Sequence, residues 1–215
     1  MPRPPQPLLD RDSIIRAALS IIDSGGLESF SLPVLARAMG VRAPSLYWHF
    51  KDRAEILRGV AMAIVSETRL PPGPSGDDWT EFFVKVSVSF RRAVLRHRNA
   101  APVLFQFMPR EAFSEVYERV AAGLGKAGIP LDRHILIVDG MERLVLGAAL
   151  TEAMKPVGRP GKLFPAVTSE NSPQLAAALA ANALSAEELF VAAIRSFLYG
   201  AVQPALPRPA TRSRA

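Results

Sequence analysis

The chain has 215 residues, of which 49% are apolar and 21% are charged, and its formal net charge is +6. This length and apolar content suffice to bury a hydrophobic core without disulfides. Because the sequence contains no cysteine, thiol catalysis, thiolate metal sites and a disulfide scaffold are excluded, and we expect a reducing, cytoplasmic location. Half of the net charge, +3, lies beyond residue 155, so the overall positive charge says little about function by itself.

Several other classes of protein are disfavoured. The first seven residues include four prolines and no apolar stretch, so we expect no secretory signal. The most apolar long segment, 135–154, is interrupted by Asp139, Glu142 and Arg143, which disfavours a membrane span and a membrane partner. The three histidines lie far apart in the sequence, so we expect no metal site and no cofactor. No set of acid, base and nucleophile can be assembled, and we therefore expect no enzymatic activity.

Apolar residues recur at helical spacing between breaks rich in proline and glycine, and no segment alternates with the period of a strand. The first helix begins at Asp10 or Asp12 and ends at Gly25. Short helices over 31–39 and 43–49 follow, and a capping pattern at 52–55 opens a helix through residue 65. Further helices are predicted over 78–97, 101–107, 110–127, 131–154, 173–181 and 185–202, with a long loop at 155–173. The pattern predicts an all-α chain.

Residues 31–53 carry the clearest functional pattern. Gly40, Val41 and Arg42 separate two short helices, which is the spacing of a helix-turn-helix unit whose second helix enters the major groove of DNA. Leu46 and Phe50 are four residues apart and are expected to pack inward. The polar and aromatic side chains between them are then free for phosphates, base edges or thymine methyl groups.

The same window carries a local charge of +3, from four basic residues and Asp52. Arg53 is expected at the first position of the next helix, where free amide groups also favour a phosphate. The alternative is structural: Tyr47, Trp48, His49 and Phe50 can equally form an aromatic core corner, since short helix pairs joined by glycine are common in all-α proteins.

The window resembles a known family. Residues 30–41 read Phe-Ser-Leu-Pro-Val-Leu-Ala-Arg-Ala-Met-Gly-Val, and residues 44–51 read Pro-Ser-Leu-Tyr-Trp-His-Phe-Lys; both are similar to the DNA-binding domain of the TetR (tetracycline-repressor) family of transcriptional regulators. Asp-Trp at 78–79, Ser-Phe-Arg at 89–91, His-Arg at 97–98, Pro109 and Leu-Gly at 146–147 extend the likeness over most of the chain.

The resemblance implies an all-α homodimer with an N-terminal three-helix helix-turn-helix head and a C-terminal helical bundle core for regulation and dimerisation. We expect a disordered Pro-rich arm at 1–9, a DNA-binding domain at 10–52, a ligand-binding and dimerisation domain at 53–202, and a disordered basic tail at 203–215. Pro33 stands where a base-reading arginine is found in the family, so the operator preference should differ there. The expected DNA contacts are Ser31, Arg42, Ala43, Pro44, Ser45, Tyr47, Trp48, His49, Lys51 and Arg53.

The resemblance also implies an effector pocket, with a different lining. Family members that bind tetracycline with Mg²⁺ use His, Asn, His and Gln side chains. Three of these positions are occupied here by Val86, Leu104 and Val120, and the fourth falls at Thr68 or Arg69. We therefore expect a hydrophobic effector and no response to magnesium-tetracycline. The alternative is a filled core. The expected pocket residues are Val65, Arg69, Phe83, Val86, Phe90, Leu104, Phe107, Met108, Phe113, Val116, Val120 and Met141.

Helices 131–154 and 185–202 mix small and large residues, which suits a four-helix interface between two copies. The alternative is an ordinary packing contact inside one chain. His97 and Arg98 are expected to act as helix-end residues. The expected interface residues are Gly140, Gly147, Ala148, Ala193, Phe197, Gly200 and Ala201.

These expectations describe a ligand-responsive repressor that binds a pseudo-palindromic, double-stranded DNA operator as a homodimer. A small hydrophobic effector in the C-terminal pocket would release it by moving the helix that begins at residue 53. Two alternatives remain open: a DNA-binding dimer with no effector, and an all-α interaction protein that binds no DNA.

Overall fold

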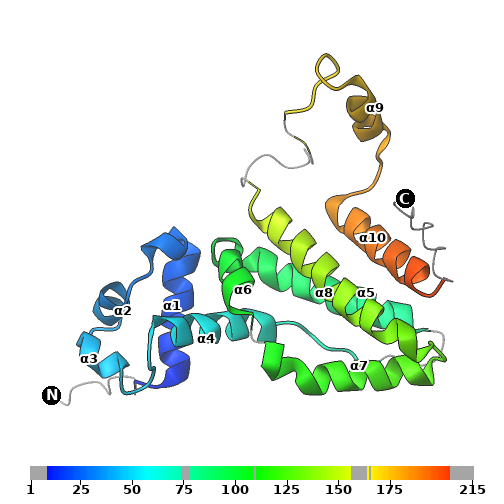
Figure 1. Ribbon diagram of the computed structural model, residues 1–215. Helices are drawn as coiled ribbons and strands as arrows, with labels where there is room; N and C mark the ends of the chain where they lie inside the picture. Colours follow the sequence, from blue (N-terminus) through cyan, green and yellow to red (C-terminus); the bar gives the residue numbers. More distant parts are fainter. Residues whose placement is uncertain (1–8, 74–77, 109, 156–163, 165, 204–215) are drawn as a thin grey trace, which may run out of the picture.

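The computed structural model describes residues 9–73, 78–108, 110–155, 164 and 166–203. Within these residues the chain contains helices and turns and no strand, which confirms the predicted all-α class. Figure 1 shows a head built from the first helices, joined to a larger bundle. The α-helices are α1 (Arg11–Gly25), α2 (Leu32–Ala38), α3 (Ala43–Leu46), α4 (Arg53–Ser66), α5 (Trp79–Arg96), α6 (Ala101–Phe107), α7 (Ser114–Lys126), α8 (Leu131–Ala153), α9 (Pro173–Ala181) and α10 (Ala186–Ala201).

Parts of three predictions lie outside the described residues. They are most of the Pro-rich arm (1–8), almost all of the basic tail (204–215), and much of the long loop (156–163 and 165). Pro109, one of the residues that carry the family resemblance, is also outside them.

Side-chain caps explain where the head helices begin. Asp10, not Asp12, caps α1, and its carboxylate accepts the amide N–H of Ser13 at 2.6 Å. Asp52 caps α4 by accepting the amide of Glu55 at 2.7 Å. The Glu55 carboxylate does not return to Asp52 as in a capping box; it accepts the amide of Lys51, one residue earlier, at 2.7 Å.

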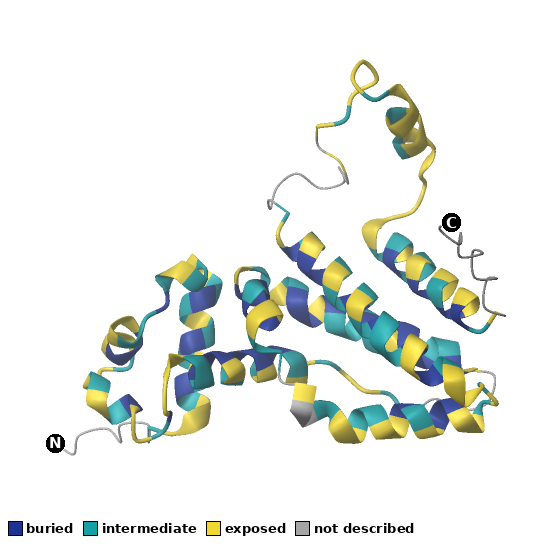
Figure 2. Cartoon of the chain, in the orientation of Figure 1, coloured by how far each residue is buried: buried dark blue, intermediate teal, exposed yellow. Residues whose placement is uncertain are grey.

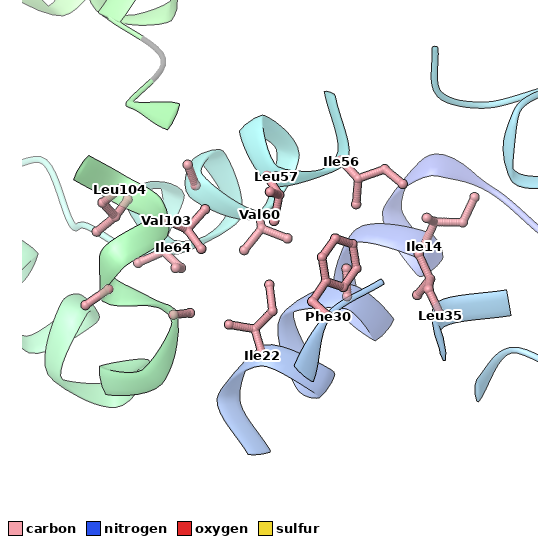
Figure 3. Packing of buried hydrophobic residues seen from close by; sticks show 14 of the residues in the cluster. Ile14, Ile22, Phe30, Leu35, Ile56, Leu57, Val60, Ile64, Val103 and Leu104 are labelled. Atoms are coloured by element: carbon pink, nitrogen blue, oxygen red, sulfur yellow. The ribbon is translucent and has the colours of Figure 1, made fainter. Parts of the chain in front are cut away.

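The first hydrophobic core joins the head to the bundle (Figure 3). Ile14 and Ile22 of α1 pack with Leu57 and Ile64 of α4, and each is fully buried. Burying an aliphatic side chain of this size contributes about 1.5–3 kcal/mol. Leu104 of α6 closes the same core. The predicted boundary between the DNA-binding domain and the ligand-binding domain, at residues 52 and 53, thus separates helices α1 and α4, which share one core. The division into these two domains stays a prediction.

The second hydrophobic core holds the bundle together. Figure 2 shows dark blue, buried residues on the facing sides of α5, α8 and α10. Phe82 of α5, Leu124 of α7, Ile137 of α8 and Ile194 of α10 all belong to it. The four helices therefore surround a common apolar interior, as the helical spacing of the sequence predicts.

A buried ion-pair network ties three helices of the bundle. The side chain of Arg91 on α5 is 7% exposed and donates to Glu152 of α8 at 2.6 and 2.7 Å. It also donates to Glu187 of α10 at 2.9 Å. Arg92, the next residue, pairs with Glu187 at 2.7 Å but is 61% exposed.

Helix α9 lies apart from the bundle in Figure 1, and none of its residues is buried. No single described helix is long and apolar enough to cross a membrane; α9 and α10 pass that test only as a pair, bent by 97°.

Candidate functional site

The predicted helix-turn-helix is formed by α2, a tight turn and α3. Gly40 adopts a φ of +65°, a conformation that favours glycine, and the amide of Val41 donates to the carbonyl of Ala36 at 3.0 Å. The α-helical part of α3 is shorter than predicted and ends at Leu46. Beyond it the chain tightens into turns, with the amide of His49 donating to the carbonyl of Leu46 at 3.0 Å.

The two predicted inward residues, Leu46 and Phe50, are buried, with 1% and 3% exposed. Tyr47 is 57% exposed and Trp48 is 88% exposed. The aromatic segment is therefore divided: Phe50 belongs to the core, whereas Tyr47 and Trp48 face solvent. This excludes the alternative in which the whole segment is a buried corner.

The remaining predicted DNA-contact residues lie around these two aromatics. Arg42, Pro44, Lys51 and Arg53 are exposed. The others are half-buried, namely Ser31, Ala43, Ser45 and His49.

Two of the predicted contacts also interact within the chain. The Ser31 hydroxyl accepts the amide of Val34 at 3.4 Å and so caps α2. The guanidinium of Arg53 lies 5.3 Å from the centre of the Phe30 ring.

Arg11, which sequence reasoning did not single out, holds the aromatic segment in place. Its guanidinium donates to the carbonyl of His49, lies 4.1 Å from the centre of the Phe50 ring, and pairs with Glu55 at 2.6 Å. The hydrogen bond from the backbone of Lys51, followed by that from Arg11, lowers the pKa of Glu55. No sequence signal connects Arg11 to residues about forty positions away.

A cavity of about 400 Å³ lies between the end of α4 and helices α5, α7 and α8. That volume fits a compound of drug size. Its wall is formed by Met62, Val65, Ser66, Thr68, Leu70, Phe82, Phe83, Val86, Ser87, Phe90, Met108, Phe113, Val116, Tyr117, Val120, Val138, Met141, Glu142, Val145 and Leu146.

Nine of the twelve predicted pocket residues line this cavity: Val65, Phe83, Val86, Phe90, Met108, Phe113, Val116, Val120 and Met141. Leu104 does not, because α6 packs toward α1 and α4 and buries Leu104 completely in the first core. Phe107 packs against the same core. Arg69 is exposed, and its amide donates to the Ser89 hydroxyl at 2.7 Å.

Of the two candidates for the fourth position, Thr68, which follows the end of α4, lines the cavity and Arg69 does not. The Thr68 hydroxyl oxygen is buried and has no hydrogen-bond partner among the described residues. A buried hydroxyl normally has a partner, so this oxygen is an exception within the described chain.

The opposite wall contains a polar cluster that sequence reasoning missed. The Tyr117 hydroxyl donates to Glu142 at 3.1 Å, and Arg110 donates to the same carboxylate at 2.8 Å. Burial, and then the charge of Glu142, raises the pKa of Tyr117 to about 12, so the phenol keeps its proton. The sequence does carry a signal here, since Val138, Met141, Glu142 and Val145 share one face of α8.

A group of polar contacts centred on His97 joins the head to the bundle. The ring nitrogens of His97 lie 2.7 Å from the carboxylate of Asp23 on α1 and 2.9 Å from that of Glu67 after α4. Asn99 donates to the carbonyl of Asp23 at 2.7 Å. His97 therefore links three parts of the chain, instead of acting only as a helix-end residue.

The predicted dimer residues fall into two groups. Gly140 lies under the ring of Phe197 in the same chain, Ala201 is buried, and Ala148 packs against the second core. These four residues, with Phe197 counted among them, pack inside one chain, where α8 and α10 contact each other. This is the alternative of an ordinary internal contact. The other three predicted residues are exposed, namely Gly147, Ala193 and Gly200.

The described part of the chain contains no group of three or more His, Asp or Glu residues that could hold a metal ion.

Comparison with known proteins agrees with this geometry. Residues 14–60 match the family described as bacterial regulatory proteins, tetR family. Residues 71–201 match the tetracyclin repressor-like C-terminal domain. The class D tetracycline repressor protein of Escherichia coli is 29% identical over 170 residues, covering 78% of this chain and 76% of that protein. The class E protein, also from Escherichia coli, is 31% identical over 146 residues, covering 67% and 69%.

Solved structures show the same fold. ActR from Streptomyces coelicolor, without ligand, covers 90% of this chain and 95% of its own length, with a TM-score of 0.72 and 24% identity. A protein of Streptomyces coelicolor A3(2), described as a possible TetR family transcriptional regulator, is 27% identical with a TM-score of 0.71, covering 89% of this chain and 98% of its own length. Since both family matches lie in chain order and together span most of the sequence, the chain belongs to the TetR family of bacterial DNA-binding regulatory proteins.

Proposed function

We propose that this regulator is a cytoplasmic repressor that binds a pseudo-palindromic operator as a homodimer and is released by an apolar effector. The observation that carries the DNA-binding part is the exposure of Tyr47 and Trp48 beside Arg42, Lys51 and Arg53. Large aromatic side chains this exposed are typical of a surface that a partner covers. The surrounding cations supply phosphate contacts, and the aromatics and His49 supply contacts to bases.

The effector part of the proposal rests on α4, which belongs to both functional regions. Its first turns, with Ile56 and Leu57, pack in the core of the head, whereas Met62 and Val65 line the cavity. A ligand against the end of α4 can thus bias the position of the head. It does so only by binding the released arrangement more tightly than the DNA-bound one.

Ligand complexes of proteins with this fold support the same use of the cavity. ActR has been solved in complex with actinorhodin, and a TetR variant from Acinetobacter baumannii in complex with minocycline. In this chain Val86 and Val120 line the cavity at positions where the resemblance implies polar tetracycline contacts. An aliphatic side chain cannot replace a hydrogen bond to magnesium-tetracycline, and we expect no response to that complex.

The dimer part of the proposal rests on the outer faces of α8 and α10. Leu131 and Ile135 are 81% and 76% exposed on α8, and Tyr199 is 71% exposed on α10. Gly147 and Gly200 are exposed, with open space where a Cβ would stand. Exposed apolar residues together with small exposed residues on the same two helices favour packing against a second copy. Two heads held at a fixed separation then suit two half-sites one helical turn apart.

The DNA-binding proposal is tested with operators selected from random duplexes by the purified protein. Tyr47→Ala and His49→Ala should each weaken binding in fluorescence anisotropy by about tenfold or more and relax the sequence preference. Lys51→Ala should weaken binding to all sequences. It should also reduce the slope of log affinity against log salt concentration by about one unit per head. Lys126→Ala, which removes one positive charge at the end of α7, is the matched control and should behave as the wild type.

Two results would contradict the proposal. Unchanged affinity and preference in Tyr47→Ala and His49→Ala would reject the reading face and favour an interaction protein that binds no DNA. Operator binding that no apolar compound weakens would leave a DNA-binding dimer without an effector. N-phenyl-1-naphthylamine, a neutral apolar fluorophore, is a suitable first compound.

A further inference from the structure

The cavity wall is apolar except at a few points, and one of them is charged. Glu142 is the one Asp, Glu, Lys or Arg side chain among the described residues that line the cavity. Its side chain is 19% exposed, whereas that of its partner Arg110 is 60% exposed. Arg110 is not among the lining residues. Glu142 therefore forms part of the cavity wall, and the cation that balances its carboxylate lies toward solvent.

The hydrogen bonds of Glu142 leave it able to accept one more. Its Oε1 accepts from Arg110 at 2.8 and 2.7 Å, and its Oε2 accepts from Tyr117 at 3.1 Å. A carboxylate offers about four lone-pair positions, so roughly one remains free. The Tyr117 hydroxyl donates its proton to Glu142, so the phenol oxygen can only accept a hydrogen bond from a bound molecule. This corner of the wall thus offers acceptors and negative charge.

We propose that the cavity selects uncharged compounds that present an N–H or O–H donor to Glu142 and Tyr117, and that it rejects anionic compounds of the same shape. This inference rests on the proposed effector binding and specifies the chemical class of the compounds that bind. The physical basis is desolvation: an anion in this cavity loses water, meets an apolar wall, and faces a like charge at Glu142. A neutral donor instead gains a hydrogen bond to a charged acceptor.

Three compounds of nearly one shape test the inference. N-phenyl-1-naphthylamine is neutral and carries one N–H donor. In 1-benzylnaphthalene a CH₂ group replaces that N–H, and 1-anilinonaphthalene-8-sulfonate adds a negative charge to the same body. Fluorescence titration measures the two amines, and competition with the neutral amine measures the hydrocarbon. We expect the hydrocarbon and the sulfonate each to bind about tenfold more weakly than the neutral amine.

Two substitutions on α8 assign the selectivity to Glu142. Glu142→Gln removes the charge at nearly constant size and should bring the affinity for the sulfonate within about threefold of that for the neutral amine. Asp139→Asn is the matched control, because Asp139 lies one turn away, pairs with Arg143 at 2.6 Å and is absent from the cavity wall. It should keep the wild-type ratio. A Val120→Trp variant, which fills the cavity, identifies any binding elsewhere on the surface.

The outcomes separate the two proposals. If the sulfonate binds wild-type protein as tightly as the neutral amine, or if Glu142→Gln leaves their ratio unchanged, the inference about ligand chemistry is overturned while effector binding stands. If none of the compounds binds in a manner that Val120→Trp abolishes, the cavity does not take apolar ligands and the proposed effector site itself is rejected.

Discussion

Arg91 and Arg92 are neighbours on α5 that share the acceptor Glu187 but differ in burial, with 7% and 61% of their side chains exposed. We expect Arg91→Met to destabilise the protein strongly and Arg92→Met to have no measurable effect. Methionine keeps the apolar volume of either side chain. The pair therefore isolates the effect of removing a buried cation from that of removing an exposed one.

The magnitude follows from what Arg91 leaves behind. Removing one member of a buried ion pair costs about 3–5 kcal/mol, because the remaining charge is left without a partner. Glu152 and Glu187 are 22% and 37% exposed, so water recovers part of this cost, and Glu187 keeps Arg92. We therefore expect a loss of about 2–3 kcal/mol, or about 4–12 °C in melting temperature for a chain of this size. The Arg92 guanidinium is already in contact with water, and its attraction to Glu187 is screened by solvent and salt, so its removal should not change stability measurably.

Urea unfolding followed by circular dichroism at one protein concentration measures the difference, since a dimer makes the midpoint depend on concentration. Adding Glu152→Leu to Arg91→Met should recover part of the loss, because it removes the orphaned carboxylate. Equal midpoints for Arg91→Met and Arg92→Met, or a double variant less stable than Arg91→Met, would refute the assignment of stability to burial of this network.

Two further predictions concern the junction and the bundle. Burial opposes the charged form of His97, but its hydrogen bonds to two carboxylates outweigh burial and raise its pKa. Its contribution to stability should be complete below about pH 6.5 and be lost as the pH rises through the raised value. His97→Gln should flatten that part of the profile of melting temperature against pH, and an unchanged slope would reject the junction as its source. Gly140→Ala should cost about 1–3 kcal/mol because its Cβ would overlap the Phe197 ring. Gly125→Ala, where the nearest atom would be 3.9 Å away, should be neutral or stabilising in the same urea assay, and equal effects would exclude overpacking as the cause.

Local signals in the sequence predicted most of the fold. Periodic apolar residues, the capping pattern at Asp52, and the glycine turn at Gly40 act over one or two turns of helix, so they can be read without knowing the tertiary structure. The inward pair Leu46 and Phe50 follows from the same spacing.

The sequence by itself thus determined an all-α chain, a helix-turn-helix with its inward residues, and nine of the twenty residues of the cavity wall, because each depends on helical periodicity or on matched segments. Only the tertiary structure decided that Arg11 braces the aromatic segment and that Leu104 lies in the first core. It alone also brings Arg110 and Tyr117 to Glu142. These outcomes depend on how helices far apart in sequence cross, and no local spacing encodes that crossing. The positive charge of the whole chain indicates little about function. The basic residues around Tyr47 and Trp48 indicate a DNA-binding surface, because the structure shows that both aromatic side chains are exposed.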